Sequence, residues 1–271
     1  MTIISKNIPQ QYQGFALTPL LWNNEAIYNL KQLDIATEFT SSVSINIPQN
    51  LMLGKRVERF TSHLLQQNKD IDILQENIQI NHNKITVGEL DCLLMHNDTP
   101  THIEVVYKFY LYDDSVGNTE LDHLIGPNRK DSLVEKLVKL QQKQLPLLFR
   151  PETKPVLDKL GYLATSFKQR VYFKAQVFLP INQPNIRFKK LNNDCIIGFY
   201  ARIEELNDYH SAKFYIPKKV DWLIIPHQHI NWINFETFNA EVESHLSKQK
   251  SPMCWMKKTN GELLKFFVVW W

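Results

Sequence analysis

The sequence predicts an α/β protein built around a mixed β-sheet, and three observations support this class. The apolar residues of segment 54–68 recur with a helical period. Three strand-like segments follow it, at 77–80, 84–95 and 102–111, and a second helix is expected at 129–145. Helices and strands are told apart by the spacing of their apolar residues. The expected core therefore has the order α-β-β-β-α.

The chain before this core is expected to be helical and then irregular. Residues 9–35 predict one or two short helices that break near Pro19 and pack on the core. Residues 36–50 are rich in Thr, Ser and Asn and predict a polar connector. Residues 1–50 are thus expected to form an N-terminal helical extension.

The first core helix has one apolar face. Val57, Phe60, Leu64 and Leu65 recur at i, i+3, i+7 and i+8, which is the spacing of an amphipathic helix. Glu58 lies beside that face rather than opposite it. This acidic residue is therefore expected near the edge of the helix contact.

Polar turns separate the strands and open the second helix. Asn81-His82-Asn83 joins the first two strands, and residues 96–101 join the second strand to the third. Gly126-Pro127-Asn128 precedes the second helix. The leucines of that helix are expected to face inward and its lysines largely outward.

After the second helix, the pattern changes to a strand and then to a series of shorter elements. Segment 170–179 alternates well enough to join the sheet, and a short helix is expected at 156–160. The remaining elements are strands at 195–202, 213–216, 222–225, 253–257 and 263–270, with a helix at 235–248. Residues 51–182 are therefore predicted to form the core. Residues 183–271 are predicted to form an aromatic-rich α+β extension packed on it.

Composition excludes several classes of protein. With 271 residues, 44% hydrophobic and 22% charged, the chain matches a globular protein. No stretch approaches a membrane span and the N-terminus lacks a signal-peptide pattern, so a cytoplasmic protein without membrane association is expected. The 8 glycines form neither GxGxxG nor GxxxxGK[ST], which disfavours nucleotide binding through a glycine-rich loop. Three widely spaced cysteines indicate free thiols in a reducing compartment.

The net charge of +3 is unevenly distributed. Residues 129–219 carry 18 Lys and Arg against 8 Asp and Glu, whereas the rest of the chain carries 13 against 20. A basic middle suits a protein that meets a polyanion on one face. Solvated helix faces are the alternative, with about equal weight.

Four ionisable residues on two adjacent strands mark the candidate site. Glu89 and Asp91 share one face of the second strand, and Glu104 and Lys108 share one face of the third. Charges are rarely buried in a sheet unless they are paired or hold a metal. Carboxylates are the hard oxygen ligands that Mg²⁺ and Mn²⁺ prefer. The alternatives are salt bridges, to arginines of the preceding helix or between Glu104 and Lys108.

The GELD sequence followed by IEV resembles the GEID and VEVK strands of PD-(D/E)xK nuclease-like proteins. This resemblance implies an α-β-β-β-α core with a mixed sheet and a Mg²⁺ or Mn²⁺ cofactor. It implies Asp91 and Glu104 as metal ligands, Glu58 as the carboxylate of the helix and Glu89 as an accessory carboxylate. It also implies a catalytic lysine on the third strand, for which Lys108 is the candidate.

The position of that lysine departs from the nuclease pattern. The pattern has Lys two residues after the Glu, but Val106 stands there and Lys108 comes two residues later. Residues four apart on a strand have Cα atoms about 13 Å apart, against about 7 Å for residues two apart. Lys108 lies on the correct face, and its side chain could swing back toward a metal. The shift also fits a protein in which catalysis has been lost.

Other residues are candidates for nucleic-acid contacts. In some nuclease-like families the helix after the third strand carries a Gln or Lys near the metal, which implies Lys136 and Gln144. Arg129 and Lys130 stand at the start of the basic segment.

The chain is further similar to a bacterial family catalogued as domain of unknown function 1853. The matching segments are GELDCLL at 88–94, EVVYKFYL at 104–111, GPNRKDSLVEKL at 126–137 and FFVV at 266–269. This resemblance covers most of the chain, and it names a family without naming a reaction.

The sequence therefore predicts a metal-dependent phosphodiesterase, a nuclease that acts on DNA. The alternative is a nuclease-like module without catalysis that binds nucleic acid or a protein partner. A purely structural partner of another protein is a third interpretation.

Overall fold

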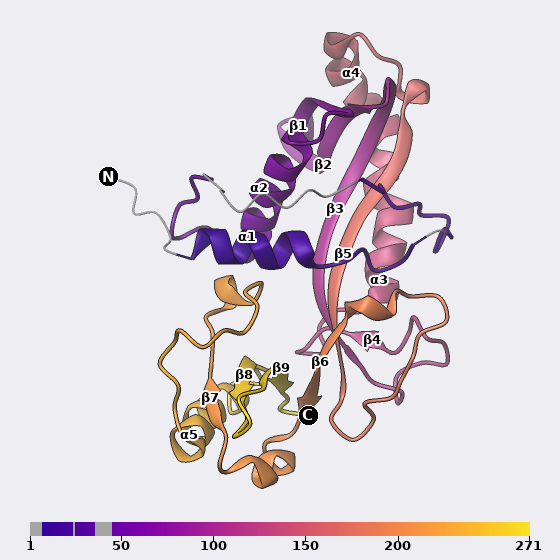
Figure 1. Ribbon diagram of the computed structural model, residues 1–271. Helices are drawn as coiled ribbons and strands as arrows, with labels where there is room; N and C mark the ends of the chain where they lie inside the picture. The colour runs from indigo at the N-terminus through magenta and orange to yellow at the C-terminus, as the bar shows by residue number, and fades with distance from the viewer. Residues whose placement is uncertain (1–6, 24, 36–44) are drawn as a thin grey trace.

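A single mixed β-sheet runs through most of the chain, as the computed structural model shows (Figure 1). Its strands lie in the order β1-β2-β3-β5-β6-β9-β8-β7, and the short β4 (Leu124–Ile125) pairs with β3. The structure describes residues 7–23, 25–35 and 45–271, so part of the predicted connector lies outside the described residues. The predicted mixed α/β class is confirmed.

The predicted meander forms the first half of the sheet. Its antiparallel strands are β1 (Ile71–His82), β2 (Ile85–His96) and β3 (Thr99–Tyr112). β1 pairs with β2 along its whole length, but β2 pairs with β3 only from Cys92↔Ile103 to His96↔Thr99. Within the described chain, no strand pairs with this edge of β3 between that ladder and Leu111, where β4 begins. The two strands therefore diverge halfway along β3.

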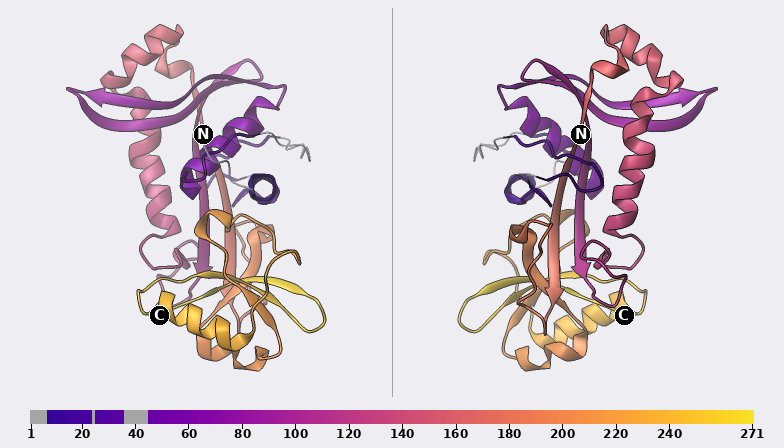
Figure 2. Two further views of the ribbon diagram at one scale, coloured as in Figure 1. Left: turned by 90° about the vertical axis from the view of Figure 1, so that its left-hand side faces the viewer. Right: turned by 90° about the vertical axis from the view of Figure 1, so that its right-hand side faces the viewer.

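The strand β5 (Lys168–Pro180) lies parallel to β3, paired from Thr101↔Lys168 to Leu111↔Phe178. Parallel neighbours need a crossover connection. Here the crossover contains α3 (Leu133–Lys139), a π-helical turn (Leu140–Gln144) and α4 (Lys154–Leu160). Helix α3 lies on one side of the β3–β5 pair, opposite α1 (Ile8–Leu17) and α2 (Leu53–Gln66) (Figure 2).

The C-terminal segment extends the same sheet. The strands β6 (Ile196–Ala201) and β9 (Leu263–Val268) continue it in parallel, and β8 (Met253–Lys257) and β7 (Lys213–Tyr215) follow in antiparallel pairing. Helix α5 (Phe235–Leu246) packs on these strands through Phe238 and Val242. The sheet is therefore continuous across the predicted boundary at 182/183.

Alternation along β3 builds two apolar layers. Ile103 and Phe109 face α1 and α2, whereas Val106 and Tyr110 face α3. Side chains on a strand point alternately to opposite faces, so one strand supplies both cores. The α1–α2 layer also contains Phe267 of β9. Residues from all three predicted segments thus share one core.

Of the one or two short helices expected in residues 9–35, the described residues contain one, α1, and residues 20–23 and 25–33 run beside β5 instead. The Leu21 amide donates to the Phe173 carbonyl at 2.8 Å, and the Leu33 amide donates to the Val171 carbonyl at 2.8 Å. Buried backbone groups need hydrogen-bond partners. This segment provides hydrogen-bond partners for the first half of β5, because β6 pairs with β5 only from Val177 to Pro180.

Two further predictions need correction. The helix expected from Arg129 begins at Leu133, because Ser132 caps it with Glu135 in a capping box. The strand expected at 222–225 is absent from the described sheet. Instead, the carbonyls of Trp222 and Ile224 accept hydrogen bonds from the buried Lys265 ammonium. A side chain there provides the partners that a neighbouring strand would have provided.

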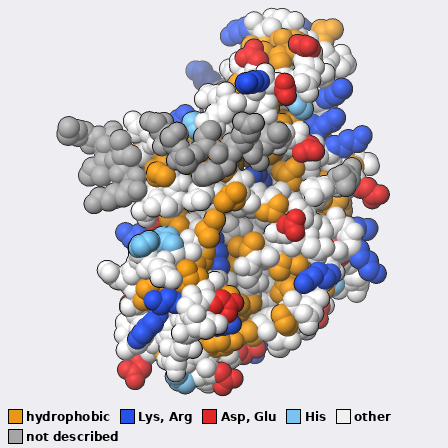
Figure 3. All heavy atoms as spheres, viewed as in Figure 1, with side chains coloured by type: hydrophobic (Ala, Val, Ile, Leu, Met, Phe, Trp, Pro, Cys, Tyr) orange, Lys and Arg blue, Asp and Glu red, His pale blue; other side chains and the backbone are white. Residues whose placement is uncertain are grey.

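The exterior mixes both signs of charge with apolar side chains. Hydrophobic side chains gather across the middle of the face in Figure 3, and lysines, arginines and acidic residues lie around its rim. No helix in the described part of the chain is long and apolar enough to cross a membrane.

Phe267→Ala is expected to destabilise the whole chain. Phe267 has no exposed surface, and its ring lies 4.8 Å from that of Phe178 and 5.2 Å from that of Trp222. Removing a buried Phe ring costs about 3–5 kcal/mol of unfolding free energy. Chemical denaturation should show one cooperative transition at lower denaturant, and Leu163→Ala at a surface position is the control. Two separate transitions, with only one moved, would contradict the shared core.

Candidate functional site

A cleft of about 790 Å³ follows the unpaired edge of β3. The N-terminal end of α2 and the residues Lys136 and Gln144 line opposite sides. The lower end is lined by Pro127, Asn128, Lys130, Asp131, Lys219, Val220 and Trp222. The left view of Figure 2 shows this edge between α2 and α3, below the β1–β2 hairpin and above the C-terminal elements. The divergence of β2 from β3 therefore opens the site.

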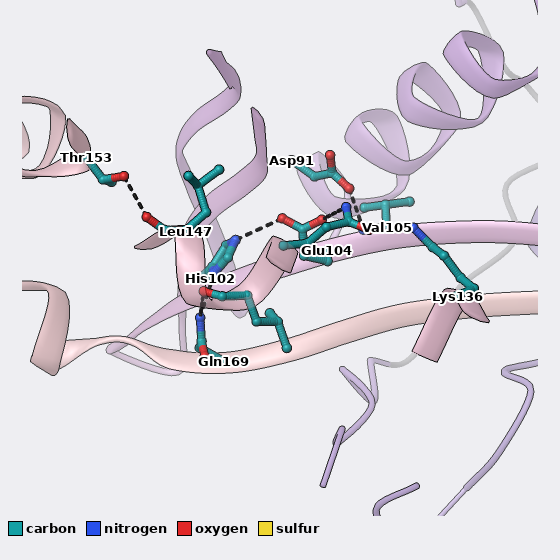
Figure 4. A network of polar contacts seen from close by, with 10 residues as sticks. Asp91, His102, Glu104, Val105, Lys136, Leu147, Thr153 and Gln169 are labelled. Atoms are coloured by element: carbon teal, nitrogen blue, oxygen red, sulfur yellow. Dashed lines mark hydrogen bonds and ion pairs between the residues drawn. The ribbon is translucent and has the colours of Figure 1, made fainter. Parts of the chain in front are cut away.

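Asp91 and Glu104 lie where the two strands separate (Figure 4). The Asp91 carboxylate accepts a hydrogen bond of 2.8 Å from the Val105 amide. This side-chain bond replaces the ladder bond that β2 no longer supplies, so Val105 keeps a partner at the point of divergence. The two predicted metal ligands are thereby brought to neighbouring positions.

Glu104 is fully buried and held from two sides. One carboxylate oxygen lies 3.1 Å from His102 Nε2, and the Gln144 amide donates to the other. The Gln169 amide donates to His102 Nδ1 at 3.0 Å, so we assign the ring proton to Nε2, which donates to Glu104. Burial lowers the pKa of His102 to about 4, which keeps the ring neutral. These contacts fix the Glu104 side chain in one orientation.

The two carboxyl groups titrate near neutrality. Burial, followed by the charge of Glu104, raises the pKa of Asp91 to about 7. Burial also raises the pKa of Glu104 to about 7, against the opposing charge of Lys136. The charge of Glu104 disfavours ionisation of Asp91, whereas hydrogen bonds with Asp91 lower the pKa of Glu104, so we expect the pair to share one proton around pH 7.

Lys136, rather than Lys108, is the lysine whose charge acts on both carboxylates. Its ammonium donates to the Gln144 carbonyl at 2.7 Å, and burial lowers its pKa to about 8. Gln144, which donates to Glu104, is the last residue of the π-helical turn. A hydrogen bond from the Leu145 amide to the Leu140 carbonyl closes this turn. Such turns inside helices are frequent at functional sites.

Lys108 lies in the same cleft but is held elsewhere. Its ammonium lies 2.5 Å from the Asp131 carboxylate, in the loop before α3. Asp131 also closes that loop, since its carbonyl accepts from the Gly126 amide at 2.7 Å. In this arrangement Lys108 neutralises Asp131 rather than the pair on β2 and β3.

The two other predicted carboxylates meet at a lysine. Lys55 of α2 lies 2.8 Å from Glu58 and 3.5 Å from Glu89. Glu58 lines the cleft, and its charge contributes to raising the pKa of Asp91. Glu89 lies on β2 outside the residues that line the cleft. The helix carboxylate is thus close to the pair, and the accessory carboxylate is held at the rim.

The two basic residues that precede α3 separate. Lys130 is exposed and lines the cleft. Arg129 turns away, with its guanidinium 2.7 Å from the Asp113 carboxylate and 4.2 Å from the centre of the Trp271 ring. Arg129 therefore stabilises the contact between this loop and the C-terminus.

The donor set suits a hard divalent cation held by few protein ligands. No group of three or more His, Cys, Asp or Glu side chains in the described residues is arranged to hold a metal. Mg²⁺ is commonly bound by one or two carboxylates, with water and substrate phosphates completing its shell. Asp91 and Glu104 provide two such carboxylates, and a cation between them would stabilise the ionised forms that burial disfavours.

His102 and Gln169 are site residues that sequence reasoning missed. His102 stands two residues before Glu104, so strand alternation alone would place both side chains on one face. Gln169 comes from β5, and only the parallel pairing of His102 with Gln169 brings it there. The position of His102 could therefore have been inferred from strand alternation in the sequence, whereas that of Gln169 could not.

Comparison with known proteins gives one match. Residues 4–269 match the family described as Domain of unknown function (DUF1853). No curated protein and no solved structure matches the chain.

Asp91→Asn is expected to change how stability depends on pH. A carboxyl whose pKa is raised on folding stabilises the protein below its unfolded pKa, and this contribution is lost as pH rises through the folded pKa. Wild-type stability should therefore fall relative to that of the variant between about pH 5 and pH 8, by on the order of 3 kcal/mol. Urea unfolding across this range measures it, with Asp158→Asn on the surface of α4 as the control. Parallel curves for wild type and Asp91→Asn would contradict the buried pair.

Proposed function

Because the chain belongs to the DUF1853 family, whose description names no reaction, its function has to be inferred from its site, and we propose a metal-dependent phosphodiesterase that cleaves DNA. The observation that carries this proposal is the buried Asp91–Glu104 pair with Lys136 beside it. Two carboxylates and a lysine at the edge of a cleft are the groups that such hydrolysis needs.

The order of elements supports a PD-(D/E)xK nuclease-like core within residues 51–182. Helix α2 precedes the β1-β2-β3 meander, α3 follows it, and β5 returns parallel to β3. Asp91 and Glu104 occupy the second and third strands of that order, as the motif requires. The proposal therefore uses both the chain order and the adjacency of the two carboxylates.

Asp91 and Glu104 would hold Mg²⁺ or Mn²⁺ in this proposal. The bound ion would position a water and neutralise charge that develops on the phosphodiester. The neutral His102 ring and Gln144 keep Glu104 oriented toward Asp91. Because Glu104 is fully buried, the protein also keeps bulk water away from one side of the pair.

Lys136 is proposed to take the role that the motif gives to a lysine on the third strand. A lysine with a pKa near 8 can exist in both protonation states close to neutral pH, so it can exchange a proton with a water near the carboxylates. Lys108 and Lys130 line the same cleft and would contact substrate phosphates. With Lys136 in this role, the site could remain catalytic although Val106 occupies the position where the motif has its lysine.

A catalytically inactive module that binds nucleic acid or a protein partner is the second candidate. The observation that favours it is the state of the motif residues, because Lys108 pairs with Asp131 and both Glu104 oxygens already have protein partners. In this case His102 and Gln144 would replace the metal as the groups that satisfy Glu104. Salt-dependent DNA binding without cleavage would support this candidate.

The proposal includes a reducing, cytoplasmic location. Cys92, Cys195 and Cys254 are all buried and unpaired by disulfides. Burial raises the pKa of each thiol, so these cysteines are packed as apolar residues and are not nucleophiles.

Asp91→Asn and Glu104→Gln are each expected to abolish cleavage. Purified protein with Mg²⁺ or Mn²⁺ would be incubated with linear, nicked and branched DNA, and each variant should be slower by at least about 100-fold. Cleavage that persists unchanged in both variants would overturn the assignment. The same amide substitutions should also remove any rise in melting temperature that Mg²⁺ produces above pH 7, where the wild-type pair is ionised.

Lys136→Met and Lys108→Met separate the two lysine assignments. Loss of a positioned acid–base group typically costs about 100- to 10,000-fold in rate, so Lys136→Met should lower the rate constant for cleavage by that range. Lys108→Met should chiefly raise KM, because Lys108 would contact substrate phosphates while its ion pair with Asp131 holds it away from the carboxylate pair. The reverse pattern would return the catalytic role to Lys108.

A further inference from the structure

A second cavity continues the cleft toward the C-terminal part of the chain. It has a volume of about 490 Å³ and lies between the 216–219 segment and the end of α5. Asn128, Lys130, Lys219 and Trp222 line both cavities. The carboxylate pair therefore lies at one end of a groove that extends along the C-terminal extension.

The lining of this second cavity is strongly basic. The positively charged residues are Lys130, Lys218, Lys219, Lys248 and Lys250, and no carboxylate lines it among the described residues. All five of these lysines are exposed. The lysines that form ion pairs in the described chain are others: Lys55, Lys108, Lys154 and Lys258. We name the five exposed lysines of the second cavity, Lys130, Lys218, Lys219, Lys248 and Lys250, the lysine track.

The two cavities differ in their acidic residues. The first is lined by Glu58, Asp91 and Asp131 together with four lysines, whereas the second is lined by lysines and His245 without a carboxylate among the described residues. A row of lysines without carboxylate partners, beside the proposed hydrolytic site, is suited to a chain of phosphates, because each phosphate contact releases a condensed counterion. Trp222 is half-buried where the two cavities meet, and an aromatic ring in a basic groove can stack with a base.

The depth of the carboxylate pair restricts the form of nucleic acid. Glu104 has no exposed surface, so a phosphodiester reaches the pair only by entering the cleft. Cavities of about 300–1,000 Å³ hold single small molecules. The first cavity, at about 790 Å³, therefore has room for a few nucleotides of one strand and not for a duplex.

We propose that the lysine track binds the backbone of a single-stranded nucleic acid segment and leads it to Asp91 and Glu104. This proposal rests on the proposed function for the reaction at the pair, but the binding itself requires no catalysis. Four of the five lysines belong to the C-terminal extension, which would therefore provide most of the contacts that favour a single strand.

The test compares two triple variants of the full chain. Lys218, Lys248 and Lys250 become Ala in the track variant, whereas the exposed Lys69, Lys159 and Lys168, which line neither cavity, become Ala in the control. Lys219 is left intact because its ammonium lies 5.5 Å from the Trp222 ring. Both variants lose the same charge, so a difference between them depends on position.

Binding is measured by fluorescence anisotropy in EDTA, with a labelled single strand of about 12 nucleotides and a matched blunt duplex. The track variant should bind the single strand about tenfold more weakly than wild type, with a log–log salt dependence shallower by about 2, because each lost contact removes about 0.7. The control should match wild type. Wild type should bind the single strand more tightly than the duplex.

Several outcomes would overturn the proposal. If the track and control variants bind the single strand with equal affinity, the lysine track is not the binding site. If wild type binds strand and duplex with equal affinity, the proposed preference for single strands is rejected. Displacement of the strand by polyglutamate at equal charge concentration would assign the track to an acidic protein instead. Asp91→Asn separates binding from catalysis: if this variant still binds the single strand but no longer cleaves it, both proposals are supported. If wild type shows track-dependent binding but never cleaves DNA, the binding proposal stands and the proposed nuclease activity is rejected.

Discussion

The parallel pairing of β3 with β5 is the constraint on which the rest of the structure depends. It runs from Thr101↔Lys168 to Leu111↔Phe178, so it forms the middle of the sheet. Parallel neighbours cannot be joined by a tight turn, and the crossover places α3 on the face opposite α1 and α2. Lys136 and Gln144 reach Glu104 only because this connection passes over the face that Glu104 occupies. The site thus follows from the connectivity of the sheet.

Buried lysines hold the irregular segments against that sheet. Lys174 of β5 donates to the carbonyls of Phe15 and Ala16 at the end of α1, and Lys265 of β9 donates to those of Trp222 and Ile224. Burial lowers the pKa of each lysine to about 7. Buried carbonyls without partners would be costly, so these side chains take the place of missing strand neighbours. They attach the N-terminal helix and one wall of the cleft to the core.

The site combines groups that separately would destabilise the fold. Two buried carboxylates, a neutral histidine and a partly buried lysine occupy one end of the cleft. Each is tolerated because another member of the set, or a glutamine, provides its hydrogen bond or opposing charge. Perturbed titration of this kind clusters at functional sites. The cleft lies directly beside the pair, which is the setting that the proposed function requires.

Local patterns in the sequence determined the helix α2, the three-stranded meander, the strand β5 and most C-terminal strands, because apolar periodicity reflects which face is buried. They also placed Asp91 and Glu104 on adjacent strands as paired candidates. Tertiary structure decided what local patterns could not: the irregular course of residues 20–23 and 25–33, the hydrogen bonds to the Trp222 and Ile224 carbonyls, and the direction of each lysine side chain. The sequence made both Lys108 and Lys136 candidates for the site. Only the packing shows that Lys108 pairs with Asp131 and that Lys136 lies beside the carboxylate pair. Side-chain partners depend on residues far apart in the chain, and no local spacing records them.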